Sequence, residues 1–375
     1  MNFKLAVIEE TMNTLFTRTR LSFLRNLEGM SKSDLARRIG VSPAAVTQWE
    51  SGVKTPSPES IARVAQALNV TADFFTPGDL AEPATPETMH YSTKSAKMLS
   101  EHAQKGALAY VTAAQYVDSM LATYVDFPAR NLPDIPADPE VQESTIPELA
   151  AELVRQDWAV PANEPIRHLI RFAENNGVRV IWAPERASAC APYSVDTGTF
   201  PLVVLNTWSQ DYYQQRVDLA TQLGHLVMHA DAEPQRKPYW DQATSFAEHL
   251  LLPAEAFERE FPKRFTQDGW MRLFEMKEKW GVPVQWMLSC AHHRGILKTR
   301  RYHERLQELK AYGWKMIEPG NIGTPEDSSL YPAAIRLITD EGYASAEQLS
   351  EQSRVPGWCF ALITSRALRI EHISK

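Results

Sequence analysis

The chain has 375 residues, of which 44% are hydrophobic and 23% charged, as is ordinary for a globular protein of two or three domains. No run approaches the roughly 20 apolar residues of a membrane span, and residues 1–20 lack the basic start and apolar core of a secretory signal. The three cysteines lie far apart, which argues against a disulfide framework and a CxxC metal site. We therefore expect a cytoplasmic protein without membrane contact.

The net charge of −7 is unevenly distributed along the chain. Residues 18–77 contain eight Lys or Arg against five Asp or Glu, so this segment carries about +3 and the remainder about −10. A basic head on an acidic body indicates a protein that touches phosphates with one end only.

Composition and periodicity predict the organisation of the chain in order. Apolar residues at helical spacing predict a helix over 95–123, and apolar runs at 178–182 and 202–205 predict strands. Pro-rich stretches separate these segments. The expected units are an extension at 1–17, a basic helical domain at 18–76, a linker and helical connector at 77–145, an α+β domain at 146–263, and a helical C-terminal region at 264–375.

Two short helices joined by a tight turn are predicted within the basic segment. The first runs from about Ser31 to Gly40, and the second begins at Ser42-Pro43 and ends before Gly52, because Ser favours the N-cap, Pro the first turn and Gly the end of a helix. This is the helix-turn-helix pattern. Short or amide-bearing residues of the second helix would face base edges in the major groove. These are Ser42, Pro43, Ala44, Thr47 and Gln48.

The same residues carry a family resemblance. The run Leu35-Ala36, Val41-Ser42, Trp49-Glu50-Ser51-Gly52 and Leu68-Asn69-Val70 resembles the XRE/Cro-type repressor helix-turn-helix over about residues 18–75. The resemblance implies a five-helix domain that inserts its third helix into DNA, as a homodimer on a palindromic double-stranded operator. By position, it implies phosphate contacts from Ser33, Arg37, Ser51 and Lys54.

A second resemblance centres on the segment Thr221-Gln222-Leu223-Gly224-His225, which continues to His229. The segment is similar to the zinc helix of the ImmA/IrrE metallopeptidase-like family, a gluzincin-like α+β fold, where H-E-x-x-H supplies two metal ligands and a general base. Residues 202–206 resemble the edge strand that precedes this helix. Taken together, the two resemblances span about residues 18–350.

The chain departs from that motif where the chemistry lies. Thr221 replaces the first His, Gln222 replaces the general-base Glu, and Gln242 falls near the position of the acidic third ligand. A neutral amide is no base at pH 7, and Thr is a poor zinc ligand. The resemblance therefore implies a pseudo-peptidase with no catalytic residues, no metal and no cofactor, whose cleft keeps Thr221, Gln222, His225, His229 and Gln242.

Two alternatives stay open at this point. His225 and His229 are spaced i, i+4 and could form an unorthodox metal site with Asp241, Glu248 or His249, which would make the chain an active protease that cleaves a repressor. The chain could also be an antitoxin-like protein that acts by binding a partner. The leading interpretation is a mainly α transcriptional repressor with a pseudo-peptidase domain that senses a small-molecule or protein effector and assists dimerisation.

Overall fold

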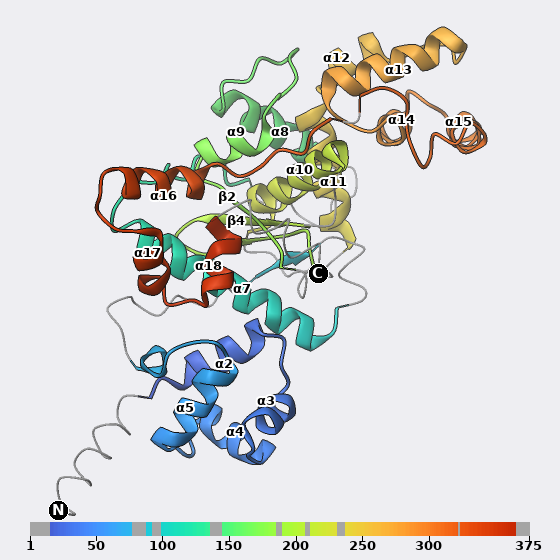
Figure 1. The fold of residues 1–375 in the computed structure, drawn as a ribbon. Coiled ribbons are helices and arrows are strands. Elements are labelled where there is room, and N and C mark those ends of the chain that lie inside the picture. Colours follow the sequence, from blue (N-terminus) through green and yellow to red (C-terminus); the bar gives the residue numbers. More distant parts are fainter. Residues whose placement is uncertain are drawn as a thin grey trace, which may run out of the picture.

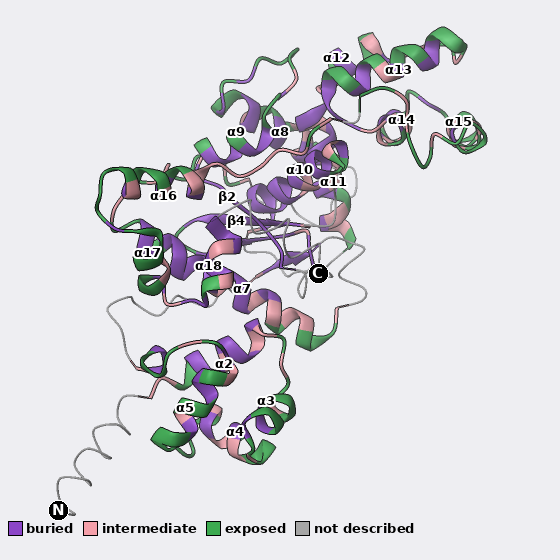
Figure 2. Cartoon of the chain, in the orientation of Figure 1, coloured by how far each residue is buried: buried purple, intermediate pink, exposed green. Residues whose placement is uncertain are grey.

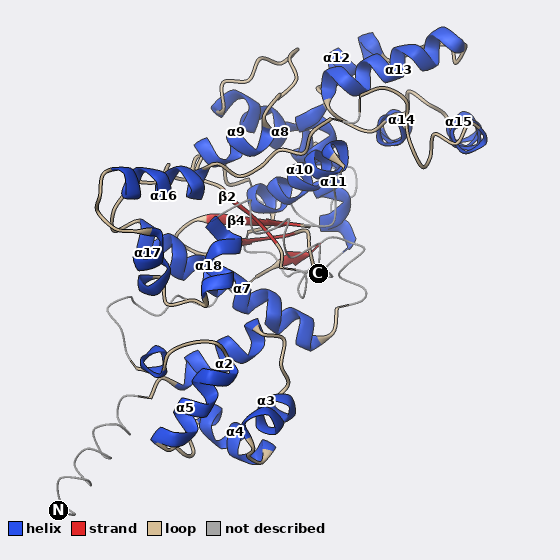
Figure 3. Ribbon diagram, in the orientation of Figure 1, coloured by secondary structure: helices blue, strands red, loops and turns tan. Residues whose placement is uncertain are grey.

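The computed structural model describes residues 16–76, 88–91, 99–135, 145–184, 190–206, 211–230, 237–321 and 323–364. This part of the chain is mainly helical with one small sheet, which confirms the expected fold class (Figure 3). The predicted extension at 1–17 and the linker at 77–87 lie almost entirely outside the described residues. None of the described helices is long and apolar enough to cross a membrane.

The N-terminal head is a bundle of short helices around one apolar centre. Leu21, Leu35 and Val46 are fully buried in it, and Trp49 is nearly so. The backbone N–H of Thr17 donates to the carbonyl of Phe75, which closes the bundle at its two ends. The helices confirm the five-helix expectation: α2 (Arg18–Leu27), α3 (Lys32–Ile39), α4 (Pro43–Ser51), α5 (Pro58–Ala67) and the 3-10 helix η1 (Ala72–Phe75).

A four-stranded sheet forms the centre of the body, in the order β1-β3-β4-β2. Strands β2 and β4 are parallel, whereas β3 pairs antiparallel with both β4 and β1. The expectation that residues 202–206 form an edge strand was wrong, because β1 and β3 extend the sheet beyond β4. The strands are β1 (His90–Tyr91), β2 (Arg179–Trp182), β3 (Tyr193–Asp196) and β4 (Pro201–Leu205).

The sheet separates two apolar cores. Because successive side chains of a strand point to opposite faces, Leu202 and Val204 enter one core and Val203 and Leu205 enter the other. All five residues of β4 are buried, which is why the sequence shows an unbroken apolar run there (Figure 2).

Each core is completed by its own set of helices (Figure 1). One core contains the head and four helices, α7 (Glu101–Leu121), α16 (Leu330–Asp340), α17 (Ala346–Gln352) and α18 (Gly357–Thr364). The other contains α8 (Ile146–Asp157), α9 (Leu169–Asn175), α10 (Tyr212–Met228), α11 (Lys237–Leu251), α12 (Ala254–Glu260), α13 (Gln267–Trp280), α14 (Val284–His293) and α15 (Thr299–Ala311). The region expected at 264–375 is thus mainly helical where described, with a non-helical stretch before α16, and it contributes to both cores.

The head is joined to the body by contacts with α7 and α18. The rings of Phe23 in α2 and Tyr116 in α7 pack edge to face with centroids 5.8 Å apart. The indole Nε1 of Trp358 in α18 donates to Glu28 Oε1 at 2.8 Å. The N-terminal head therefore shares a core with the body (Figure 1).

Candidate functional site

The turn between α3 and α4 is fixed by its capping residues. The Ser31 hydroxyl accepts from the N–H of Asp34, whose carboxylate accepts from the N–H of Ser31, so both ends of a capping box are present. Gly40 ends α3 with a φ of 70°, and the hydroxyl of Ser42 accepts from the N–H of Ala45 to begin α4. The predicted helix-turn-helix therefore forms with the expected helix limits to within a residue.

The outer face of α4 presents the residues predicted to meet base edges. Pro43, Ala44 and Thr47 are exposed and Gln48 is half-buried. The Thr47 hydroxyl donates to the carbonyl of Pro43 at 3.1 Å, which leaves its methyl group to face outward. The side-chain amide of Gln48 makes no hydrogen bond within the described part of the chain, so it can bind an outside partner.

Exposed polar side chains flank α4 on both sides. Ser33 and Arg37 are exposed on α3, and Ser51 and Lys54 are exposed at and beyond the end of α4. Arg18, which sequence reasoning did not place at this surface, donates from Nη1 to the carbonyl of Ser51 at 2.9 Å. The surface around α4 therefore holds the cations that a phosphate backbone requires.

A buried ion pair holds α4 against α2. Arg25 donates to both carboxylate oxygens of Glu50, at 2.5 and 3.2 Å, and both side chains are 8% exposed. A third bond runs from Arg25 to the carbonyl of Met30 at 2.7 Å. Because the guanidinium fork matches a carboxylate, the pair fixes the orientation of α4 as well as its position.

The second candidate site is a cluster of three histidines at the end of α10. Nδ1 of His225 lies 3.0 Å from Nδ1 of His229, and Nε2 of His229 lies 3.0 Å from Oε1 of Gln242 in α11. Since the amide oxygen accepts, His229 carries its proton on Nε2, and its Nδ1 accepts from His225. The structure thus brings together three of the five predicted cleft residues.

His90 of β1 completes the cluster, and sequence reasoning missed it. Its ring stacks on His225 with centroids 4.8 Å apart, and its Nε2 donates to the carbonyl of His229 at 2.7 Å. A lone histidine in a segment that reads as linker gives no signal of this role. Only the pairing of β1 with β3 places it over α10.

The cluster is buried and uncharged. His225 and His229 are each 1% exposed. Burial lowers the pKa of His90 and of His229 to about 4, and it lowers the pKa of His225 well below its usual value, with the neighbouring imidazoles adding to that effect. Near pH 7 the three rings are therefore neutral and act as hydrogen-bonding groups.

Thr221 and Gln222, two positions at which the chain departs from the peptidase motif, take no part in the hydrogen bonds of the cluster. Thr221 donates its hydroxyl to the carbonyl of Val217 at 2.8 Å. Gln222 is 0% exposed, and neither its Oε1 nor its Nε2 has a hydrogen-bond partner. Of the residues expected to line the cleft, Gln222 and His225 are buried in the packed interior and Thr221 is half-buried.

The motif implies a zinc ion, which would need metal-binding side chains around the histidine cluster. The acidic and imidazole groups proposed as further ligands lie elsewhere: Asp241 pairs with Lys237, Glu248 binds His293 at 2.7 Å, and His249 bonds the carbonyl of Ser245. Within the described ranges no group of three or more His, Cys, Asp or Glu could hold a metal ion. The residues present therefore do not fit a zinc site with three protein ligands.

Two known protein families match the chain, one in the head and one in the body. Residues 21–75 match the helix-turn-helix family, and residues 173–288 match the IrrE N-terminal-like domain family of peptidases. No curated protein matches the chain significantly. The expected fusion of a DNA-binding helix-turn-helix to an IrrE-like domain is confirmed.

Proposed function

We propose that this chain, which joins a DNA-binding helix-turn-helix to an IrrE-like domain, is a homodimeric transcriptional repressor whose peptidase-like domain has lost hydrolysis. The observation that carries the proposal is the outer face of α4, where Thr47 and Gln48 present a methyl group and an unpartnered amide. An amide can bond adenine bidentately, and a methyl group can contact the thymine methyl.

The assignment of base and phosphate contacts gives a direct test. DNA sequences are first selected from a random pool by the full chain. In Thr47→Ala/Gln48→Ala, affinity for the selected sequence should fall about tenfold or more, because each lost base contact costs about 1–3 kcal/mol. Binding to random DNA, which depends on salt, should survive in the same variant.

Gln66→Ala on the exposed side of α5 serves as the matched control and should bind as the unaltered protein does. The selected sequences should be palindromic, and light scattering should give two chains per duplex. Unchanged discrimination in the double variant would show that α4 does not read the bases. Asymmetric sequences bound by one chain would contradict the homodimer.

Loss of hydrolysis is supported by the chemistry of the buried cluster. The position of the general base holds Gln222, an amide, and the position of the first ligand holds Thr221, whose hydroxyl is engaged by Val217. His225, His229 and Gln242 instead satisfy one another. We propose that these five residues form the remnant of a peptidase cleft, kept as a packed polar centre.

Metal content separates this proposal from an unorthodox protease. Elemental analysis of the purified, untagged protein should find less than about 0.1 zinc per chain, both unaltered and in His225→Ala. Thr221→His/Gln222→Glu, which restores the first ligand and the general base but not the acidic third ligand at Gln242, serves as the comparison. About one zinc per chain that disappears in His225→Ala would overturn the proposal and favour a protease that uses His225 and His229.

A further inference from the structure

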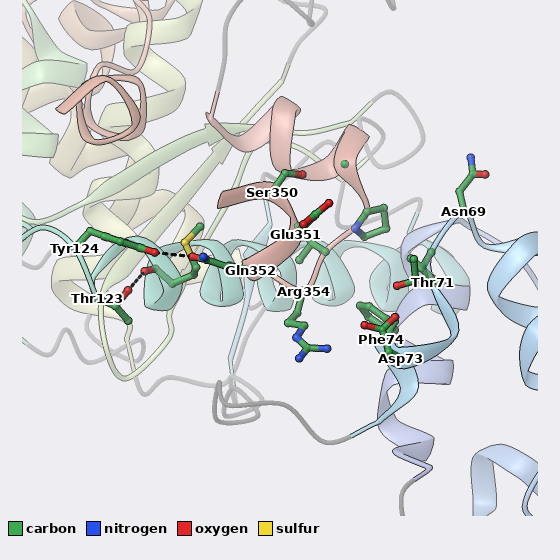
Figure 4. A pocket seen from close by; sticks show the side chains of 15 residues that line it. Asn69, Thr71, Asp73, Phe74, Thr123, Tyr124, Ser350, Glu351, Gln352 and Arg354 are labelled. Atoms are coloured by element: carbon green, nitrogen blue, oxygen red, sulfur yellow. Dashed lines mark hydrogen bonds between the residues drawn. The ribbon is translucent and has the colours of Figure 1, made fainter. Parts of the chain in front are cut away.

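A cleft lies where the head meets the body, away from the histidine cluster. Its volume is about 890 Å³, which is in the range of small-molecule sites. One wall is the end of the head, with Asp73 and Phe74 of η1. The opposite wall is the turn between α17 and α18, with Arg354 and Val355, and the end of α7 lies between the two walls (Figure 4).

Arg354 and Asp73 stand on opposite walls of the cleft and do not pair with each other, and the exposed Glu351 lies on the same wall as Arg354. The guanidinium of Arg354 is half-buried and makes no hydrogen bond or ion pair within the described part of the chain. The carboxylate of Asp73 likewise has no partner there. The half-buried guanidinium of Arg354 lacks a counterion, so binding of an anion there is favourable. Asp73 is exposed, and its carboxylate is open to a cation on the facing wall.

The rest of the cleft combines an apolar surface with polar rims. Phe74 and Val355 are buried side chains that line it, and Met120 adds the end of α7. The phenol of Tyr124 donates to Gln352 Oε1 at 2.8 Å, which links α7 to the opposite wall at one end (Figure 4). A ligand with an apolar body between two charged ends matches this arrangement.

Arg354 is held in place by its backbone. Its φ of 56° lies in the left-handed region, which few residues other than glycine adopt. The turn that carries it is anchored on both sides by α17 and by the buried α18. The guanidinium is therefore presented by a fixed turn rather than by a flexible loop.

We propose that this cleft binds a small zwitterion of the amino-acid or short-peptide class, with its carboxylate on Arg354 and its ammonium group on Asp73. Bound there, the ligand touches the head and the body at once and stabilises one arrangement of the two. Operator affinity then changes by as much as the ligand prefers that arrangement. This last step rests on the proposed repressor function, whereas the binding itself does not.

The binding test needs no DNA. Titration calorimetry on the full chain uses leucine and the dipeptide leucyl-leucine as probes. The N-acetyl derivative of each probe, which lacks the cation, and the amide of each probe, which lacks the anion, are the one-charge analogues. At least one zwitterion should bind, and its one-charge analogues should bind about tenfold more weakly or worse. No heat from either zwitterion at millimolar concentration, or equal binding of the analogues, would overturn the proposal.

Variants assign the two charges. Arg354→Gln should lose the preference for a free carboxylate, and Asp73→Asn the preference for a free ammonium group. Arg336→Gln and Asp340→Asn, which remove exposed charges on α16, are the matched controls and should bind as the unaltered chain does. Binding that is the same in all four variants would place the ligand elsewhere.

Hydrogen exchange reports whether both walls are engaged. With the bound zwitterion, amide protection should rise in 72–75 and in 350–357 together. Protection of one wall alone would contradict a ligand that bridges head and body. Because both measurements omit DNA, a failure here is distinct from a failure of operator binding, which the α4 variants measure separately.

Discussion

At the scale of single residues, the chain keeps polar side chains in a packed interior where most proteins place apolar ones. His90, His225 and His229 are buried and bonded to one another or to nearby backbone. Gln222 lies beside them in the same helix as His225, with both amide atoms unpartnered. Because the three histidines are buried, the stability of this region depends on their rings staying neutral.

We predict that acid destabilises the protein through this cluster. The folded-state pKa of His90 and of His229 is about 4, below the ordinary value of 6.5, so below pH 6.5 the unfolded chain binds protons that the folded chain does not. The stability is complete above pH 6.5 and is lost as the pH falls toward 4, at up to about 1.4 kcal/mol per pH unit for each histidine.

Urea unfolding at pH 7 and pH 5 measures this loss. His90→Phe keeps a ring over His225 but cannot be protonated, so its stability should fall less between the two pH values. His303→Phe, at an exposed histidine, is the control and should keep the full dependence on pH. An equal loss in His90→Phe would show that the cluster does not couple to unfolding.

At the scale of elements, the head depends on the orientation of α4 against α2. We predict that Glu50→Met destabilises the protein by about 3 kcal/mol and weakens DNA binding, because it leaves Arg25 buried without its counterion. Arg25→Met/Glu50→Met should regain most of the stability, since it leaves no buried unpaired charge; Lys32, which also pairs with Glu50 at 3.3 Å, is 41% exposed and stays in contact with water. Thermal unfolding of the two single variants and the double variant measures the coupling. Simple additivity would mean that the pair contributes nothing beyond its separate parts.

Helix caps and apolar runs in the sequence predicted several helices and strands correctly. The caps Ser31 and Ser42 and the left-handed Gly40 gave the limits of α3 and α4, and the apolar runs gave β2 and β4. The predicted helix over 95–123 is α7, Glu101–Leu121.

What depended on distant partners was not predicted. Strand β1 has only two residues, and its pairing with β3 decides where His90 lies. The sequence signals the departure from the peptidase motif at Thr221 and Gln222, but not the burial of Gln222 without a hydrogen-bond partner. The cleft brings together Asp73 and Arg354, which lie almost 300 positions apart in the sequence, so no local pattern could reveal it.

At the scale of the whole molecule, the head and half of the body share one core. That core runs from Leu21 in α2 through Tyr116 in α7 to Ile363 in α18. Cooperative unfolding follows, because the head cannot leave without exposing apolar surface of the body.

We therefore predict that the unaltered protein unfolds in one calorimetric transition and that Tyr116→Ala splits it into two. The substitution removes the edge-to-face contact with Phe23 and leaves a cavity at the joint, at a cost of about 3–5 kcal/mol. Phe274→Ala, in the other core, should lower the midpoint without splitting the transition. Two transitions in the unaltered protein would show that head and body unfold independently.

The bond between Trp358 and Glu28 has a consequence for how the molecule is made. Its two residues lie 330 positions apart. At about 5–20 residues per second, the ribosome makes Trp358 roughly 20 to 60 seconds after Glu28. During that interval the head has α2 to α5 but not α18, against which Glu28 packs. The helix-turn-helix is thus synthesised well before the segment of the body that completes its contacts.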